Sequence, residues 1–147
     1  MKKKEIIDIL FKNHEQTILD LKERISDALS MIDLDENDTI DPEDFSHSEE
    51  SKELNELMYI QLAKAEKELE KLKSIDFSTK SKIEEGAIVT TEKFTFCIGI
   101  ATVPFKIGDG NLMGISINAP IYEIMKDKTV GDGYTYNENQ YKILEIN

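Results

Sequence analysis

Apolar residues recur with a helical period along the first half of the chain. One series of such positions comprises Ile7, Phe11, His14, Ile18, Leu21, Ile25, Ala28 and Ile32, in which His14 is the polar exception. A second series comprises Leu54, Met58, Leu62, Ala65, Leu69 and Leu72. Steps of three and four residues form the seam of a coiled coil. Because residues 3–75 include no glycine and a single proline, the pattern predicts an antiparallel hairpin of two long helices.

The pattern changes in the second half of the chain. All seven glycines lie at or beyond Gly86, and β-branched and aromatic residues become frequent. Segments of this composition predict strands, and they cover residues 87–91, 93–103, 111–117, 134–136 and 140–147. Residues 104–111 and two shorter stretches have the composition of turns, and residues 119–128 suit one short helix that starts at Pro120. We therefore expect an α+β fold, with a helical hairpin over residues 1–78 and a small antiparallel β domain over residues 79–147.

Composition narrows the class of protein. Thirty acidic and eighteen basic residues give a net charge of −12, which argues against direct binding to DNA or RNA, because phosphate binding relies on clustered Lys and Arg. A single cysteine, Cys97, cannot form an internal disulfide, and we expect it to be a buried strand residue. The sequence lacks the pattern of a signal peptide or a membrane-spanning helix. These features together predict a cytoplasmic protein without a membrane partner.

Residues 31–45, "MIDLDENDTIDPEDF", contain seven carboxylates at the predicted tip of the hairpin, a loop expected at about residues 33–48. The candidate metal ligands there are Asp33, Asp35, Glu36, Asp41 and Asp44. A calcium loop beginning at Asp33 would require Gly at its sixth position and Glu at its twelfth, where this chain has Asp38 and Asp44. A solvated acidic turn that binds no metal, with Asp41 and Pro42 starting the second helix, is the plainer alternative.

The C-terminal residues carry a resemblance to a known family. The order of Ile115-Ser116, Ala119-Pro120, Val130-Gly131-Asp132 and the closing segment 141–146, "YKILEI", resembles the end of bacterial transcription elongation factors of the GreA/GreB type. The resemblance implies an FKBP-like C-terminal domain without prolyl isomerase activity. It also implies an accessory factor rather than an enzyme. Such a factor binds RNA polymerase core at the rim of the secondary channel and inserts its coiled coil to stimulate transcript cleavage.

In that family, acidic residues at the tip help the polymerase to hold a catalytic Mg²⁺ ion. Mg²⁺ takes hard oxygen ligands and accepts one or two carboxylates beside water and phosphate. The family motif D-L-x-E-N matches Asp33 to Asn37, with Asp33 and Glu36 as the acting carboxylates, but it follows the first helix here. Counting back from the second seam instead selects Asp44, with His47 in place of the motif's Glu. The sequence leaves open cleavage stimulation, a modulator of transcription that does not cleave, and a calcium-binding coiled coil.

Overall fold

The computed structural model describes residues 2–35 and 42–147, with the side chains of residues 31–51 left outside that description. The chain forms two compact units. The hairpin unit consists of Leu10–Glu70, and the sheet unit consists of Met1–Ile9 together with Lys71–Asn147. The first residues of the first long helix and the last residues of the second thus belong to the sheet unit. The compact units therefore divide the chain differently from the predicted ranges 1–78 and 79–147.

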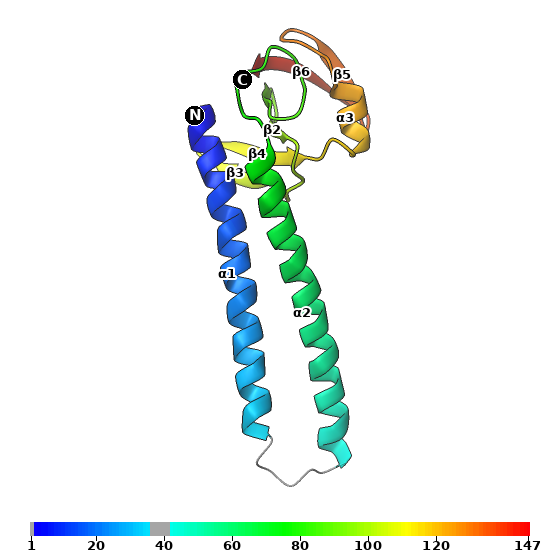
Figure 1. The fold of residues 1–147 in the computed structure, drawn as a ribbon. Helices are drawn as coiled ribbons and strands as arrows, with labels where there is room; N and C mark the ends of the chain where they lie inside the picture. Colours follow the sequence, from blue (N-terminus) through cyan, green and yellow to red (C-terminus); the bar gives the residue numbers. More distant parts are fainter. Residues whose placement is uncertain (1, 36–41) are drawn as a thin grey trace. The chain divides into compact units, whose positions relative to one another are not determined.

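Two long helices form the hairpin, as the apolar pattern predicts (Figure 1). Helix α1 spans Lys3–Asp35 and helix α2 spans Pro42–Ser74, each with 33 residues, which corresponds to about 50 Å at 1.5 Å per residue. Pro42 is the first residue of α2, where the missing N–H of proline costs nothing. None of the described helices is long and apolar enough to cross a membrane.

The seam between the helices follows the heptad more strictly than the apolar residues do. Ile18, Leu21 and Ala65 form a buried cluster, with the half-buried Leu62 and Leu69 packed against it. Near the start of α2, Asn55 is 8 % exposed whereas Leu54 is 57 % exposed. The series from Asn55 through residues 58, 62, 65, 69 and 72 keeps strict steps of three and four, so helix geometry places Asn55 rather than Leu54 on the seam.

The connection between the helices is shorter than predicted. The sequence predicts a tip loop over about residues 33–48, but α1 continues through Asp35 and α2 starts at Pro42. Residues 33–41 include neither glycine nor proline, and these are the residues that most strongly end a helix. The helical backbone therefore takes in more of the acidic stretch than its turn-like composition indicates.

The sheet has six strands in the order β3-β4-β2-β1-β6-β5. The bounds are β1 Ile88–Thr91, β2 Thr95–Ile98, β3 Phe105–Ile107, β4 Gly110–Ile115, β5 Gly133–Tyr136 and β6 Asn139–Ile146, with α3 at Pro120–Met125 between β4 and β5. The α+β class with a helical hairpin and one short helix is confirmed. The expectation of a wholly antiparallel sheet is wrong for one pair, because β2 and β4 run parallel in register from Thr95–Leu112 to Ile98–Ile115.

Strand β3 explains this parallel pair. The sequence assigns residues 104–111 to a break, but Phe105–Ile107 form an antiparallel hairpin with β4 around Gly108 and Asp109. The hairpin returns β4 into the place beside β2, and β3 becomes the edge strand. Pro104 stands immediately before β3, a position that an edge strand tolerates because its missing N–H breaks no ladder bond.

One core holds the sheet and α3 together. Its fully buried members include Val89, Phe96, Ile98, Met125 and Ile143. Aromatic rings extend this core towards the surface: Phe96 contacts Tyr141 edge to face with ring centroids 6.4 Å apart, and Tyr134 stacks on Tyr141 at 5.0 Å. Cys97, on β2, is fully buried as predicted, and burial raises the pKa of its thiol to about 12.

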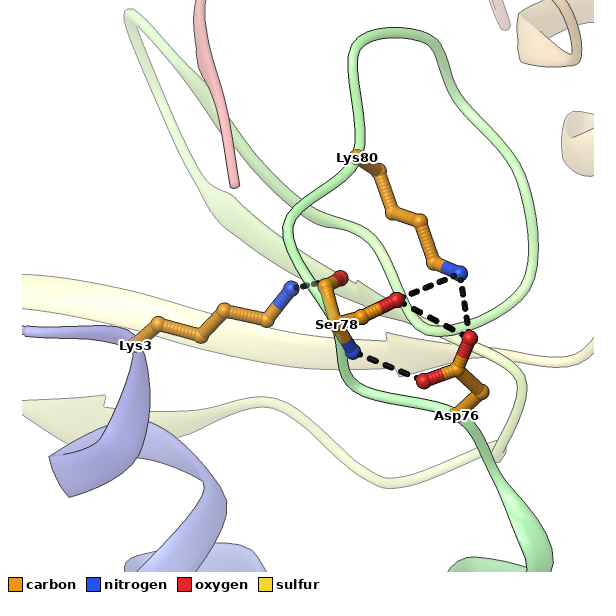
Figure 2. Close-up of polar contacts among 4 residues, drawn as sticks. All are labelled: Lys3, Asp76, Ser78 and Lys80. Atoms are coloured by element: carbon orange, nitrogen blue, oxygen red, sulfur yellow. Dashed lines mark hydrogen bonds and ion pairs between the residues drawn. The ribbon is translucent and has the colours of Figure 1, made fainter.

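A polar network follows the end of α2 (Figure 2). Ser78 donates its N–H and its hydroxyl to the two carboxylate oxygens of Asp76, at 3.0 and 2.9 Å, and Lys80 Nζ lies 3.0 Å from Asp76 Oδ2. Lys3, in the first turn of α1, donates from Nζ to the carbonyl oxygen of Ser78 at 2.9 Å. The network therefore holds the first turn of α1 to the segment that leaves α2.

This network makes the stability of the sheet unit sensitive to acid. The N–H of Ser78, together with Lys80 and the Ser78 hydroxyl, lowers the pKa of Asp76 from its ordinary value of 3.8 to about 2. A carboxyl group with a lowered folded-state pKa stabilises the fold above its unfolded pKa, and the contribution is lost as the pH falls from about 4 towards 2.

We expect Asp76→Asn to flatten the pH dependence of unfolding in this window. The measurement is urea unfolding at pH 2 to 6, followed by the near-UV circular dichroism of the tyrosines. Asp109→Asn, in the exposed turn between β3 and β4, is the matched control and should keep the wild-type slope. An Asp76→Asn curve parallel to wild type throughout the window would contradict the assignment.

Candidate functional site at the tip of the hairpin

The register of the two helices brings the acidic stretch to one end of the hairpin unit. Leu21 and Ala65 belong to one buried cluster, and Lys22 Nζ lies 4.0 Å from Glu66 Oε1 across the two helices. These contacts set the register of the two helices, which run antiparallel to each other (Figure 1). The last turn of α1 and the first turn of α2 therefore lie at the same end, on either side of the connection 36–41.

The predicted tip carboxylates fall on both sides of this connection. Asp33 and Asp35 belong to the last turn of α1, and Asp44 is the third residue of α2. Glu36 and Asp41 lie outside the described residues, as do the side chains of the other three. Whether these carboxylates converge on a metal ion stays a prediction.

The helix dipole has opposite effects on the carboxylates at the end of α1 and on those at the start of α2. The C-terminal end of a helix carries partial negative charge and the N-terminal end carries partial positive charge. Asp33 and Asp35 stand at the unfavourable end of α1, whose last turn contains no basic residue, whereas Glu43 and Asp44 stand at the favourable end of α2. The acidic residues at the end of α1 therefore cost helix stability, which makes them candidates for a functional role.

The backbone does not suit the calcium loop. In a loop of that type beginning at Asp33, the ligands at positions 1 and 3 belong to a twelve-residue loop between two helices. Here Asp33–Asp35 are helical, so the first three positions of the pattern belong to α1. Together with Asp38 at the glycine position, this argues against a calcium site of the EF-hand kind.

The net charge of the chain resides entirely in the hairpin unit. Leu10–Glu70 contain eighteen acidic and six basic residues, whereas the sheet unit contains twelve of each. Within the hairpin, residues 31–56, here called the loop end, hold eleven acidic residues and Lys52 as the one basic residue. The loop end is thus the stretch of the sequence in which most of the net negative charge is concentrated.

The residues behind the family resemblance have structural roles in the sheet unit. Gly131 donates its N–H to the Ile143 carbonyl at 2.9 Å, and Ile143 donates to the Asp132 carbonyl at 3.0 Å. The Asp132 carboxylate accepts the N–H of Thr129 at 2.8 Å, and this bond and one from the Thr129 hydroxyl lower its pKa. The Val130-Gly131-Asp132 segment and the closing strand are therefore one hydrogen-bonded assembly.

The Ile115-Ser116 and Ala119-Pro120 motif shapes the entry into α3. The Ser116 hydroxyl accepts the N–H of Asn118 at 3.2 Å, and the Ser116 carbonyl accepts the N–H of Ala119 at 3.0 Å. Pro120 then starts α3, and Ala119 occupies the cap position without a side-chain hydrogen bond. A serine at position 119 would supply that cap.

One feature of the hairpin was not predicted from the sequence. Asn55 is buried on the seam, and its Oδ1 has no hydrogen-bond partner in the described part of the chain. A polar residue on a coiled-coil seam fixes helix register at a cost in stability. The sequence does indicate the burial of Asn55, because strict steps of three and four residues along α2 lead to position 55.

Metal-ligand clusters are absent from the side chains that the structure describes, where no three His, Cys, Asp or Glu residues group closely enough to hold an ion. His14 instead makes a hydrogen bond within α1, with its Nδ1 2.9 Å from the Leu10 carbonyl oxygen. The carboxylates at residues 33–44 thus remain the candidate ligands on chemical grounds, because Mg²⁺ prefers oxygen donors.

Comparisons with known proteins find similarity to solved structures. No family model and no curated protein matches the chain. The chain is structurally similar to GreA factor homolog 1 (Gfh1) of Thermus thermophilus, with 14 % identity and a TM-score of 0.35 over 93 % of this chain and 94 % of that one. It is also similar to Gfh1 of Thermus aquaticus, with 15 % identity and a TM-score of 0.33 over 92 % of each chain.

Proposed function

We propose that this chain is an accessory transcription factor of the Gre type, which binds RNA polymerase and inserts the loop end of its hairpin into the secondary channel. The observation that carries the proposal is the segregation of charge: the hairpin unit holds all of the net charge and the sheet unit is neutral. A rod with an acidic end suits delivery of carboxylates to a metal centre in another protein. The ordered motifs of the sheet unit support the family assignment.

The chemistry proposed for the loop end is support of a Mg²⁺ ion in the polymerase. Asp33 and Glu36, or alternatively Asp44, would supply carboxylate oxygens to that ion, with Asp35 and Asp41 as further candidates. When bound, the ion would activate the water that cleaves the transcript. The chain itself contributes negative charge and position, so its activity depends on the polymerase active site, and its site of action is the cytoplasm.

A transcript-cleavage assay tests this proposal. We expect the wild-type chain to stimulate cleavage in a backtracked elongation complex, and Asp33→Ala/Glu36→Ala to reduce the stimulated rate by about tenfold or more, since carboxylates that hold a catalytic metal contribute at least about 1.4 kcal/mol. The matched control, Glu23→Ala/Asp27→Ala, removes two exposed carboxylates elsewhere on α1 and should leave the rate unchanged.

Asp44→Ala distinguishes the two candidate sets of tip carboxylates. If Asp44 acts instead of Asp33 and Glu36, its variant alone loses the stimulation. A wild-type chain that binds the polymerase core but yields no cleavage products would overturn the cleavage mechanism. A chain that does not bind the core at all, measured by co-sedimentation, would overturn the proposed function as a whole.

A second candidate function is modulation of transcription without cleavage. The observation that favours it is His47, which follows Asp44 by three residues on α2, where the family register expects Glu. An imidazole is a poor ligand for Mg²⁺. This function predicts that the chain lowers the yield of transcripts in multiple-round transcription and that His47→Glu creates cleavage stimulation. Unchanged transcript yield on addition of the wild-type chain would exclude it.

A further inference from the structure

The seam between α1 and α2 changes in character along the hairpin unit. One part, here called the shaft seam, comprises residues 18–25 of α1 and 62–69 of α2. The other part, here called the distal seam, lies nearer the connection 36–41 and comprises residues 26–30 and 52–58. The shaft seam has buried apolar side chains from both helices, namely Ile18, Leu21, Ile25 and Ala65. Among the described side chains of the distal seam, Asn55 alone is buried.

The heptad repeat relates the two parts of the seam position by position. Ala28 stands seven residues beyond Leu21 on α1, and Met58 stands seven residues before Ala65 on α2, so the two pairs occupy equivalent places. Leu21 and Ala65 are buried, whereas Ala28 and Met58 are half-buried. This layer of the distal seam is therefore less tightly packed than its equivalent in the shaft seam.

Asn55 takes the place that an apolar residue holds one heptad further along α2. That residue is Leu62, which packs against the buried cluster of the shaft seam. The Oδ1 atom of the buried Asn55 has no hydrogen-bond partner in the described part of the chain. An asparagine on a seam can specify register at a cost in stability. Asn55 incurs that cost in full, because a buried acceptor that has left water without gaining a partner is destabilising.

Opening of the distal seam would expose little apolar surface that is not already exposed. Leu29, Leu54 and Leu57 are 43 %, 57 % and 56 % exposed in the closed hairpin, so closure gains little hydrophobic stabilisation from them. Opening would also return the Oδ1 atom of Asn55 to water and so remove the cost of its burial. Both effects lower the free energy of opening at this part of the seam.

Polar contacts between the helices follow the same division. In the shaft seam, Lys22 Nζ lies 4.0 Å from Glu66 Oε1 on the other helix. Among residues 26–30 and 52–58, which the structure describes, no hydrogen bond or ion pair joins α1 to α2. An exposed ion pair contributes little to stability, but the distal seam lacks even that contribution.

We propose that the hairpin opens locally at the distal seam while the shaft seam stays packed, and that Asn55 sets how often it opens. Segments with few buried apolar contacts open at a smaller free energy than the packed elements beside them. The shaft seam holds the two helices together on one side of the distal seam. Local opening therefore changes the spacing between the helices only towards the connection 36–41.

Such opening gives the end of α1 and the start of α2 a variable separation. Asp33 and Asp35 on α1 and Asp44 on α2 stand beyond the distal seam along their helices. A site that receives these carboxylates would select the spacing that it binds best, and the shaft seam would stay unchanged. The opening itself is a property of the seam and does not depend on the proposed function.

Hydrogen exchange of the backbone amides in the full chain, followed by NMR, tests the proposal. In wild type, we expect residues 26–30 to be protected about tenfold less, or lower still, than residues 18–25. Asn55→Leu removes the unpaired amide and should raise the protection of residues 26–30 about tenfold or more, with that of residues 18–25 changed by less than about twofold. Residues 26–30 lie on the other helix, so this gain would not come from a changed helix propensity within α2.

Gln61→Leu is the matched control, because it exchanges an amide for leucine at an exposed position of the same helix. It should leave the protection of residues 26–30 within about twofold of wild type. Equal protection of residues 26–30 and 18–25 in wild type, a comparison that needs no variant, would show that the hairpin opens as one unit and would overturn the proposal. Asn55→Leu that leaves residues 26–30 unchanged, or raises the protection of both segments equally, would overturn it as well.

Discussion

Replacing Gly86 by alanine should lower the melting temperature of the sheet unit by about 10 °C or more. Gly86 has a φ of +87°, and a Cβ atom there would lie 1.9 Å from the carbonyl oxygen of Asp76. A left-handed backbone costs a non-glycine residue about 1–2 kcal/mol, and the overlap with a backbone atom forces a further displacement. The total of about 3 kcal/mol or more corresponds to that shift in a chain of this size.

Gly131→Ala separates the cost of the left-handed backbone from the cost of the overlap between the added Cβ atom and the Asp76 carbonyl. Gly131 has a similar φ of +91°, but a Cβ atom there would meet nothing within 4 Å. Its substitution should therefore cost only the backbone part, about 1–2 kcal/mol. Four of the five tyrosines lie in the sheet unit, so thermal unfolding followed by near-UV circular dichroism reports on that unit. Equal melting temperatures for the two variants would show that Asp76 does not approach Gly86.

Phe96→Ala should destabilise the sheet unit by about 4 kcal/mol. Phe96 lies on β2, is 1 % exposed and belongs to the core cluster, with ring contacts to Phe94 and Tyr141. Removal of a buried phenyl ring loses its transfer free energy and leaves a cavity, at a usual cost of about 3–5 kcal/mol. Chemical denaturation at neutral pH measures the difference.

The control for this variant is Leu144→Ala on β6. Leu144 is 48 % exposed, so its truncation should cost less than about 1 kcal/mol. Phe96→Leu, which refills part of the cavity, should recover part of the loss. A denaturation midpoint for Phe96→Ala within error of that for Leu144→Ala would place the core elsewhere in the sheet unit.

The helices were predictable because their pattern is long and regular. Seven-residue periodicity over thirty residues leaves one interpretation, and the absence of glycine excludes early breaks. The seam near residue 55 was not predicted, because the apolar residue Leu54 and the strict heptad position Asn55 are adjacent. The heptad spacing of the seam decides which positions are buried, and the single buried amide of Asn55 is tolerated at one of them.

The topology of the sheet could not be read from the strands alone. Alternating apolar and polar residues look the same in parallel and antiparallel pairs, so the parallel alignment of β2 with β4 left no local signal. Strand β3 has only three residues, between Pro104 and a glycine-rich turn, and its composition is that of a break. Likewise, the letters of the tip motif identified Asp33 and Glu36 as candidates and the register of the second seam identified Asp44, but neither specifies how far the helical backbone continues.

The neutral sheet unit and the acidic hairpin also have a kinetic consequence. In the electric field of a positively charged surface, force acts on the loop end and hardly at all on the sheet unit. The attraction therefore acts on the hairpin unit before any contact is made. Encounter rates with such a surface should then be steeply sensitive to ionic strength.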